Sequence, residues 1–271
     1  MPELPEVETI RRGLEASVVE HRIVRVLVRE PRLRQPIPAD LAERLAGRRI
    51  LSVARRGKYL LVHTDGETLL IHLGMSGRLW TLQGHPPAGP HDHVDLQMED
   101  GRTLRFHDPR RFGLMLLCEG DCAGHPLLAG IGPEPLSVAF SGAYLWERSR
   151  GHHVAIKSFL MDSHVVAGIG NIYASEALYL ARIHPARQVM RIARPRYDTL
   201  VTSIRATLDK AIGSGGTTLR DFSHVDGTSG YFGQRLDVYG RAGEPCRRCG
   251  SVIVTRRIGQ RSSFYCPRCQ R

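Results

Sequence analysis

Four cysteines near the end of the chain constrain its fold more than any other feature. They form two close pairs, Cys246-x2-Cys249 and Cys266-x2-Cys269, with sixteen residues between the pairs. Four thiolates at this spacing match the tetrahedral coordination of Zn²⁺, and a full set of protein ligands leaves no open position for a substrate. The motif therefore predicts a small hairpin built around one structural zinc ion, with redox pairs as the alternative.

The residues around these cysteines are strongly basic. Residues 246–271 contain seven arginines and no aspartate or glutamate, and the whole chain carries a formal charge of +11. Such a charge favours a polyanionic partner, with nucleic acid ahead of an anionic membrane surface. Lysine occurs only at Lys58, Lys157 and Lys210, so arginine supplies most of the charge, and its planar fork suits phosphate groups. We therefore expect a nucleic-acid-binding module.

The cellular compartment follows from what the sequence lacks. No apolar run reaches the length of a membrane span, and the acidic, proline-containing start resembles neither a signal peptide nor a transit peptide. We expect a cytoplasmic protein, associated with the nucleoid if the source is a bacterium. All six cysteines should then be reduced thiols or metal ligands, and Cys118 and Cys122 are interpreted as small buried side chains.

The first half of the chain predicts one helix followed by strands. Residues 5–20 place Val7, Ile10, Leu14 and Val18 at helical spacing. Short apolar or alternating runs follow, with Asp-Gly turn signals at residues 65–66 and 100–101, and this pattern is typical of a β-sandwich or barrel. The predicted strands are residues 23–28, 50–54, 59–63, 68–73, 78–82, 94–98, 103–107 and 113–117.

The second half predicts helices and one long loop. Glycine and proline are frequent in residues 119–142, which suggests a domain boundary, and helical patterns follow near 142–149, 154–162, 171–182 and 195–212. Two glycines precede Asn171, a candidate N-cap residue, so the start of that helix is a candidate anion site. An ordinary turn between helices is the alternative. Residues 213–233 are interpreted as a long functional loop.

Several motifs occur together along the chain. They are Met-Pro-Glu-Leu-Pro-Glu-Val-Glu-Thr at residues 1–9, Arg-Gly-Lys-Tyr-Leu at 56–60, His-Leu-Gly-Met-Ser-Gly at 72–77, Asp-Pro-Arg-Arg-Phe-Gly at 108–113 and Gly-Ile-Gly-Asn-Ile-Tyr at 168–173. With the four cysteines, this set closely resembles the bacterial formamidopyrimidine-DNA glycosylases, in the same order and over essentially the whole length.

The resemblance implies an α+β multidomain fold. It comprises an N-terminal β-sandwich with an N-terminal helix, and a C-terminal helical helix–two-turn–helix domain with a β-hairpin zinc finger, with DNA in the cleft between domains. The expected boundaries are 1–130 for the catalytic sandwich, 131–149 for a linker, 150–235 for the helical domain with its lesion loop, and 236–271 for the finger. The implied activity is excision of oxidised purines from double-stranded DNA by a monomer, followed by strand cleavage at the abasic site through β,δ-elimination.

The N-terminal residues make chemical sense of that activity. Strand cleavage calls for an amine that attacks C1′ and forms a Schiff base, and removal of Met1 would expose the amine of Pro2. An α-amine has a reference pKa of about 8 against about 10.4 for lysine, so its neutral fraction at pH 7 is roughly a few hundredfold larger. Glu3 is the candidate proton donor and shuttle, and Glu6 would hold the terminus in place. An acidic helix start is the structural alternative.

Further roles are carried over by the resemblance. Lys58 and Arg261 complete the predicted catalytic set, with Asn171 and Tyr239 in support, and the strand histidine His72 could equally be a core residue. The predicted DNA contacts are His72, His93, Arg111, Asn171 and Lys157. The residues expected to fill the gap left by a flipped nucleotide are Met75, Arg111 and Phe112. The residues expected to close over the lesion are Thr217, Thr218 and Tyr231.

Two other functions remain open. An endonuclease VIII-like glycosylase acting on oxidised pyrimidines would share Pro2, Glu3 and the finger, although residues 4–9 and 110–112 favour the purine enzyme. A zinc protein that binds DNA without catalysis would share the charge and the cysteines. RNA binding is disfavoured because no strand carries a stacking-rich motif.

Overall fold

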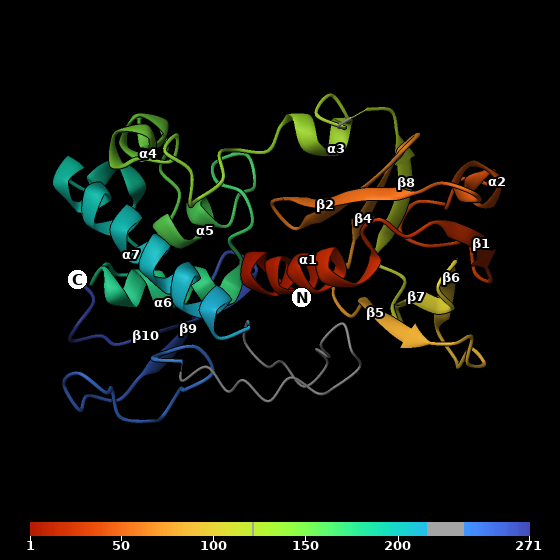
Figure 1. Cartoon of the computed structure of the whole chain (residues 1–271). Coiled ribbons are helices and arrows are strands. Elements are labelled where there is room, and N and C mark those ends of the chain that lie inside the picture. The colour runs from red at the N-terminus through yellow and green to blue at the C-terminus, as the bar shows by residue number, and fades with distance from the viewer. Residues whose placement is uncertain (121, 216–235) are drawn as a thin grey trace. The chain divides into compact units, whose positions relative to one another are not determined.

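The computed structural model describes residues 1–120, 122–215 and 236–271 (Figure 1). The chain divides into two compact units. The first comprises Met1–Ala129 with Gly215, and the second comprises Gly130–Ser214 with the described residues 236–271.

The first unit is a sandwich of two four-stranded sheets, ordered β1-β6-β7-β5 and β2-β3-β4-β8. Every pair of neighbouring strands is antiparallel. The eight strands occur at the eight predicted runs, with ends shifted by at most two residues. They are β1 (Ile23–Val28), β2 (Ile50–Arg56), β3 (Tyr59–Thr64), β4 (Thr68–His72), β5 (Arg78–Gln83), β6 (Asp92–Met98), β7 (Arg102–His107) and β8 (Leu114–Cys118).

One hydrophobic core lies inside this sandwich. Side chains from both sheets, such as Leu69 and Phe106, are fully buried in the same cluster. Helix α1 (Leu4–Val18) adds the predicted apolar stripe, including Ile10 and Leu14. The helix is shorter than the predicted 5–20 because Val19 adopts an extended backbone conformation. Alternating inward-facing side chains therefore produce the sandwich, as the sequence pattern indicated.

The second unit is mainly helical. It contains α4 (Gly142–Ser149), α5 (Ile156–Leu160), α6 (Asn171–Leu180), the short 3-10 helix η1 (Val189–Arg191) and α7 (Arg194–Gly213). Helix α7 packs against both α4 and α6. Gly170 is the N-cap of α6 and Asn171 is its first residue, so the prediction that Asn171 is the N-cap was wrong by one position. None of the helices in the described part of the chain is long and apolar enough to cross a membrane.

A β-hairpin ends the second unit. Strands β9 (Val254–Ile258) and β10 (Arg261–Tyr265) pair antiparallel around a two-residue turn that contains Gly259 in a left-handed conformation. The short helices α2 (Leu41–Leu45) and α3 (Pro126–Ala129) of the first unit were not predicted, because four or five residues are too few to show a helical period.

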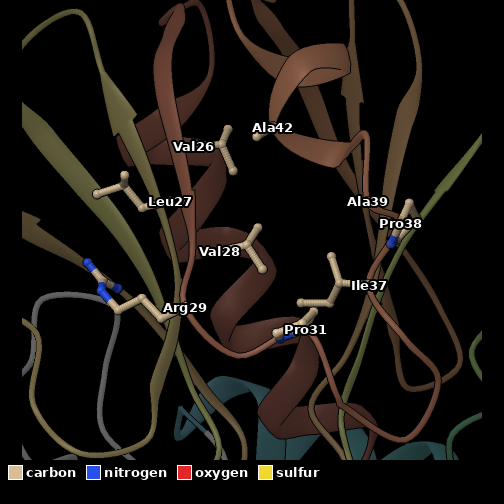
Figure 2. Close-up of a pocket in the computed structure, with 9 residues that line it drawn as sticks. All are labelled: Val26, Leu27, Val28, Arg29, Pro31, Ile37, Pro38, Ala39 and Ala42. Atoms are coloured by element: carbon tan, nitrogen blue, oxygen red, sulfur yellow. The ribbon is translucent and has the colours of Figure 1, made fainter.

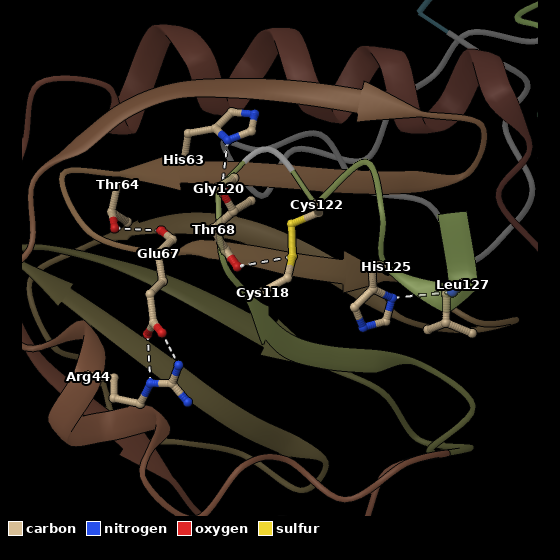
Figure 3. The surroundings of a disulfide bond; sticks show 10 residues. All are labelled: Arg44, His63, Thr64, Glu67, Thr68, Cys118, Gly120, Cys122, His125 and Leu127. Atoms are coloured by element: carbon tan, nitrogen blue, oxygen red, sulfur yellow. Dashed lines mark hydrogen bonds and ion pairs between the residues drawn. A yellow bond between two sulfur atoms is a disulfide. The ribbon is translucent and has the colours of Figure 1, made fainter. Parts of the chain in front are cut away.

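Two cysteines of the first unit form a disulfide, shown in Figure 3. Cys118 ends β8, and its Cα lies 5.5 Å from that of Cys122, inside the range that a disulfide requires. The expectation that all six cysteines are thiols or metal ligands was therefore wrong for this pair. Cys122 is buried as predicted.

Candidate active site and nucleic-acid interface

The N-terminus is fixed by a reciprocal pair of hydrogen bonds at the start of α1. The backbone N–H of Glu3 donates to the Glu6 carboxylate at 2.9 Å, and the Glu3 carboxylate accepts from the backbone N–H of Glu6. Both side chains are buried, and so is Pro2, whereas Met1 is 40% exposed. The Glu6 carboxylate is thus hydrogen-bonded to Glu3, the residue that follows Pro2 in the chain. The nitrogen of Pro2 is part of a peptide bond for as long as Met1 remains.

Three residues predicted to fill a gap in DNA lie on the surface of the first unit. Met75 is 38% exposed and Phe112 is 44% exposed, although large apolar side chains are usually buried. Arg111 lies between them in sequence order, and its guanidinium forms an exposed ion pair with Glu30. Exposed apolar side chains of this kind mark interaction surfaces when they occur together.

A buried carboxylate fixes the two loops that carry these residues. Asp108 is fully buried and accepts hydrogen bonds from the Ser76 hydroxyl and the Gly113 backbone N–H, both at 2.8 Å. Ser76 follows Met75, and Gly113 follows Phe112, so one side chain connects both loops. Asp108 is part of the motif at residues 108–113, but no role was predicted for it, because only the tertiary structure brings residues 76 and 113 together.

The same loops approach each other at Gly74. This residue has a φ of +60°, and an added Cβ would lie 2.5 Å from the carbonyl carbon of Phe112. Arg111 also has a left-handed backbone, with a φ of 54°, which a hydrogen bond from its N–H to the Asp108 carbonyl supports. A strained non-glycine residue held in this way is typical of a functional loop.

His72 and Lys58 lie at the same end of the first unit. Tyr59, the residue after Lys58, pairs with His72 across β3 and β4, and the two rings are 4.7 Å apart. Burial first, and then the nearby charges of Lys58 and Arg34, lower the pKa of His72 to about 4. The ring is therefore neutral at pH 7. Its Nδ1 accepts from the Gly74 N–H at 2.9 Å, so Nε2 carries the proton and can donate.

Two of the predicted DNA contacts are buried. Lys157 on α5 is 1% exposed, and its amine donates to the Ser262 carbonyl and the Ser263 hydroxyl of β10. His93 on β6 is buried, with Nε2 at 2.8 Å from the Asp108 carbonyl oxygen. Both side chains hold neighbouring segments in place through these contacts.

The first turn of α6 contains an unusual polar atom. The side-chain oxygen of Asn171 is buried without a hydrogen-bond partner among the described residues, and buried polar atoms are nearly always paired. Farther along α6, the buried Glu176 carboxylate accepts from the backbone N–H groups of Asp237, Val238 and Tyr239 at 2.7 to 2.9 Å. Burial raises the pKa of Glu176, and the three N–H groups oppose that shift.

Residues 237–239 are therefore tied to α6 by one carboxylate. The ring of Tyr239 also packs at 5.1 Å against that of Phe264 in β10. Glu176 was not predicted, because nothing in its local sequence pattern separates it from an ordinary helix residue. Thr217, Thr218 and Tyr231, predicted to close over the lesion, lie outside the described residues.

The four cysteines of the finger meet at one point. All four sulfur atoms lie within 4.8 Å of one another, with Cys246 and Cys269 sulfurs 3.9 Å apart and Cys249 and Cys266 sulfurs 3.5 Å apart. A tetrahedral zinc with Zn–S bonds of about 2.3 Å separates its sulfurs by about 3.8 Å. The donor set fits one structural zinc, with no open coordination position.

Arg261 lies at the other end of the hairpin. It is the first residue of β10, next to the β9–β10 turn, and its side chain is exposed. Arg261 is therefore free of the buried core of the finger and faces solvent.

A large apolar pocket of the first unit contains none of the predicted site residues (Figure 2). Its volume is about 580 Å³, and its one charged lining residue, Arg29, is paired with Asp95 at 2.6 Å. The lining therefore offers no catalytic or phosphate-binding group. The lining residues are Val26, Leu27, Val28, Arg29, Pro31, Ile37, Pro38, Ala39 and Ala42.

Three family models match the chain in succession. Residues 1–115 match the formamidopyrimidine-DNA glycosylase N-terminal domain, residues 131–223 match the formamidopyrimidine-DNA glycosylase H2TH domain, and residues 243–271 match the zinc finger found in FPG and IleRS. Among similar proteins, the chain is 55% identical to a formamidopyrimidine-DNA glycosylase of Syntrophotalea carbinolica and 56% identical to one of Methylococcus capsulatus, over 100% of each chain.

Solved structures agree with these matches. A variant of the Lactococcus lactis FPG in complex with Fapy-dG-containing DNA has a TM-score of 0.91 at 36% identity, covering 100% of both chains. The MutM (FPG) protein of Thermus thermophilus has a TM-score of 0.88 at 40% identity, covering 99% of this chain and 98% of that one. The similarity thus extends over the sandwich, the helical region and the finger.

Proposed function

Because the chain belongs to the formamidopyrimidine-DNA glycosylase family, we propose that it is a DNA glycosylase and abasic-site lyase of base excision repair that removes oxidised purines from duplex DNA. The observation that carries this proposal is the N-terminal arrangement, in which Pro2 is followed directly by Glu3, and the buried carboxylates of Glu3 and Glu6 fix the start of α1 through reciprocal hydrogen bonds to each other's backbone N–H. No other described segment combines a potential α-amine with two buried carboxylates.

The reaction begins with the amine of Pro2 after Met1 has been removed. Its nitrogen bonds to C1′ while the glycosidic C1′–N9 bond breaks, and the departing purine takes up a proton. Glu3 donates a proton to the sugar ring oxygen as the ring opens, which leaves a Schiff base on C1′. Loss of a proton from C2′ expels the 3′ phosphate, and a second proton loss at C4′ expels the 5′ phosphate. Water then hydrolyses the Schiff base and regenerates the amine.

Phosphate groups of the DNA would be held by both units. Lys58 contributes a positive charge to the phosphate site. His72 is neutral because its pKa is lowered, and the neutral ring can still donate a hydrogen bond to phosphate from Nε2. In the second unit, the amide of Asn171 at the start of α6 and the exposed Arg261 supply further contacts. Tyr239 supports this surface through its edge-to-face contact with the ring of Phe264.

The exposed loops of the first unit serve base flipping. A glycosylase takes the damaged nucleotide out of the stack and leaves a gap. Met75 and Phe112 would enter that gap as apolar wedges, and Arg111 would pair with the orphaned base. Asp108 keeps the three side chains in register by connecting their loops.

The boundaries 1–130, 131–149, 150–235 and 236–271 remain our assignment of domains, and association with the nucleoid follows from DNA binding.

Borohydride trapping tests this proposal. The processed enzyme should form a covalent complex with duplex DNA containing 8-oxoguanine opposite cytosine. The Pro2→Gly variant, in which a primary amine replaces the secondary one, should trap and cleave more slowly than the wild type while it still binds DNA. Glu3→Gln should lose base excision, whereas Glu15→Gln, an exposed change in the same helix, should keep it. Intact mass spectrometry verifies that Met1 is absent. Trapping of Pro2→Gly at the wild-type rate would show that Pro2 is not the nucleophile.

Substrate preference separates this proposal from its nearest rival. We expect faster excision of 8-oxoguanine than of thymine glycol, and the reverse order would identify an enzyme for oxidised pyrimidines. Absence of any trapped complex with either lesion, with Met1 shown to be removed, would instead leave a zinc protein that binds DNA without catalysis.

A further inference from the structure

Five arginines surround one pocket at the cysteine end of the finger. The pocket has a volume of about 370 Å³ and lies entirely within the second unit. Its remaining lining residues are the zinc ligands Cys249 and Cys269. The arginines that line it are Arg182, Arg196, Arg248, Arg268 and Arg271.

Backbone and ring contacts fix the position of this cluster. Arg196, in the first turn of α7, donates from one guanidinium nitrogen to the carbonyls of Ala181 and Arg182, at 3.1 and 2.9 Å. The guanidinium of Arg248 lies 4.8 Å from the ring centroid of Tyr179. Gln270 donates to the Ile183 carbonyl at 3.0 Å, which docks the end of the finger beside Arg182. These contacts bring arginines from three segments to one place.

Positive charge exceeds negative charge in this cluster. None of the five arginines has an ion pair with a carboxylate among the described residues, and only Arg196 among them donates a side-chain hydrogen bond there. A zinc ion with four thiolates carries a net charge of −2, which five guanidinium groups outnumber. Like charges held together destabilise one another unless an anion lies between them.

The cluster is separate from the proposed contacts of the catalytic site. Asn171 begins α6, whereas Arg182 lies two residues beyond its end, and ten helical residues span about 15 Å. Arg261 is next to the hairpin turn, whereas Arg248 and Arg268 lie within the cysteine pairs at the opposite end of the hairpin. A phosphate in the pocket is therefore a different phosphate from those at Asn171 or Arg261.

We propose that this arginine pocket is a second anion site of the second unit, and that it binds phosphate groups. Guanidinium forks from several directions suit the oxygens of a phosphate, which accept up to two hydrogen bonds from each fork. Two sources share this chemistry. One is the DNA backbone, at a phosphate other than the one at Asn171. The other is a free polyphosphate or nucleotide.

The DNA source is tested by the salt dependence of binding. Full-length, zinc-loaded protein is titrated with a duplex containing an uncleavable abasic analogue, and log K is plotted against log salt for Arg268→Gln and for the double variant R182N/R268Q. Each lost phosphate contact should reduce the slope by about 0.9, so the double variant should lose about 1.8. Asparagine is used at residue 182 because it tolerates the left-handed backbone of Arg182, whose φ is 57°.

The matched control is Arg247→Gln. Arg247 is exposed and lies between the same cysteines as Arg248, but it does not line the pocket. Its slope should equal that of the wild type. Zinc content and melting temperature are measured for each variant, and if R268Q releases zinc, R182N alone makes the comparison, since residue 182 lies outside the finger.

The free-ligand source is tested by calorimetry with inorganic tripolyphosphate. If R182N/R268Q weakens tripolyphosphate binding at least tenfold and R247Q leaves it unchanged, the pocket is supported as a site for a small phosphorylated ligand. This holds even if the salt dependence of DNA binding does not change. A changed slope without tripolyphosphate binding supports the DNA backbone. If the pocket variants match R247Q in both experiments, the proposal is overturned.

Discussion

The β-sandwich and the zinc hairpin are stabilised in opposite ways. The sandwich has a continuous apolar core to which both sheets and α1 contribute. The hairpin consists of two five-residue strands, and its small cluster of buried residues includes two of the zinc ligands, Cys246 and Cys266. Segments this small rarely bury enough apolar surface to fold alone.

The comparison shows where single changes act. In the sandwich, the contribution of any one contact is spread over many neighbours. In the hairpin, stability depends on a few point attachments, namely the metal site, the buried amine of Lys157 and the amide of Gln270. Loss of one attachment should therefore release the hairpin without unfolding the sandwich.

Removal of zinc is the largest test of this difference. Structural zinc contributes on the order of 10 to 16 kcal/mol to folding in isolated zinc fingers. Chelation should abolish DNA binding, measured by fluorescence anisotropy, while amide protection in the sandwich persists. Unchanged DNA binding after proven metal loss, or simultaneous loss of protection in both regions, would contradict the comparison.

Truncation of a side chain in the sandwich core should destabilise the sandwich and leave the zinc site intact. Phe106 is fully buried, and Phe106→Ala should lower the free energy of unfolding by about 3 to 5 kcal/mol. Zinc content should not change, because the metal site belongs to the other unit. Chemical denaturation and a zinc assay measure the two quantities, and zinc release by this variant would show that the two regions are coupled.

Loss of the Lys157 amine should loosen the hairpin while the metal remains. Lys157→Met leaves the Ser262 carbonyl and the Ser263 hydroxyl without this donor, which should cost about 1 to 3 kcal/mol. DNA affinity should fall with it, because the change acts on β10 beside Arg261. Lys210→Met, at an exposed residue, is the control and should have neither effect. Equal behaviour of the two variants would remove Lys157 from the set of attachments.

Glu176→Gln should have a smaller effect, on the segment at residues 237–239. The amide supplies one acceptor oxygen where the carboxylate supplies two. If that oxygen keeps the bonds from Val238 and Tyr239, the N–H of Asp237 loses its partner at a cost of about 1 to 2 kcal/mol. Hydrogen exchange should become faster at Asp237 and stay constant in the sandwich. Unaltered exchange at Asp237 would show that other contacts hold this segment.

The last effect, the pH response of His72, is absent at pH 7 and grows only in acid. Its pKa is lowered to about 4 in the folded protein, against about 6.5 in an unfolded chain. The neutral ring therefore contributes stability that is complete above pH 6.5 and declines as the pH falls from 6.5 to 4. His72→Gln should remove this part of the pH dependence, and NMR titration of the ring should give a midpoint near pH 4. A midpoint near 6.5 would mean that the ring is solvated.

The local pattern of the sequence determined the elements of this protein. Alternating apolar residues located all eight strands of the sandwich, and the paired cysteines located the finger, because both signals depend only on spacing along the chain. The motifs also identified the family. The exposed positions of Met75 and Phe112 agree with the predicted wedge, although the residue types alone favoured a core.

The tertiary structure decided which polar groups are paired. Asp108 and Glu176 join segments that are distant in sequence, and the buried amine of Lys157 attaches α5 to β10. The disulfide of Cys118 and Cys122 and the arginine pocket likewise depend on chain geometry. Hydrogen bonds and ion pairs act over a few ångströms in space, so spacing along the sequence does not reveal them.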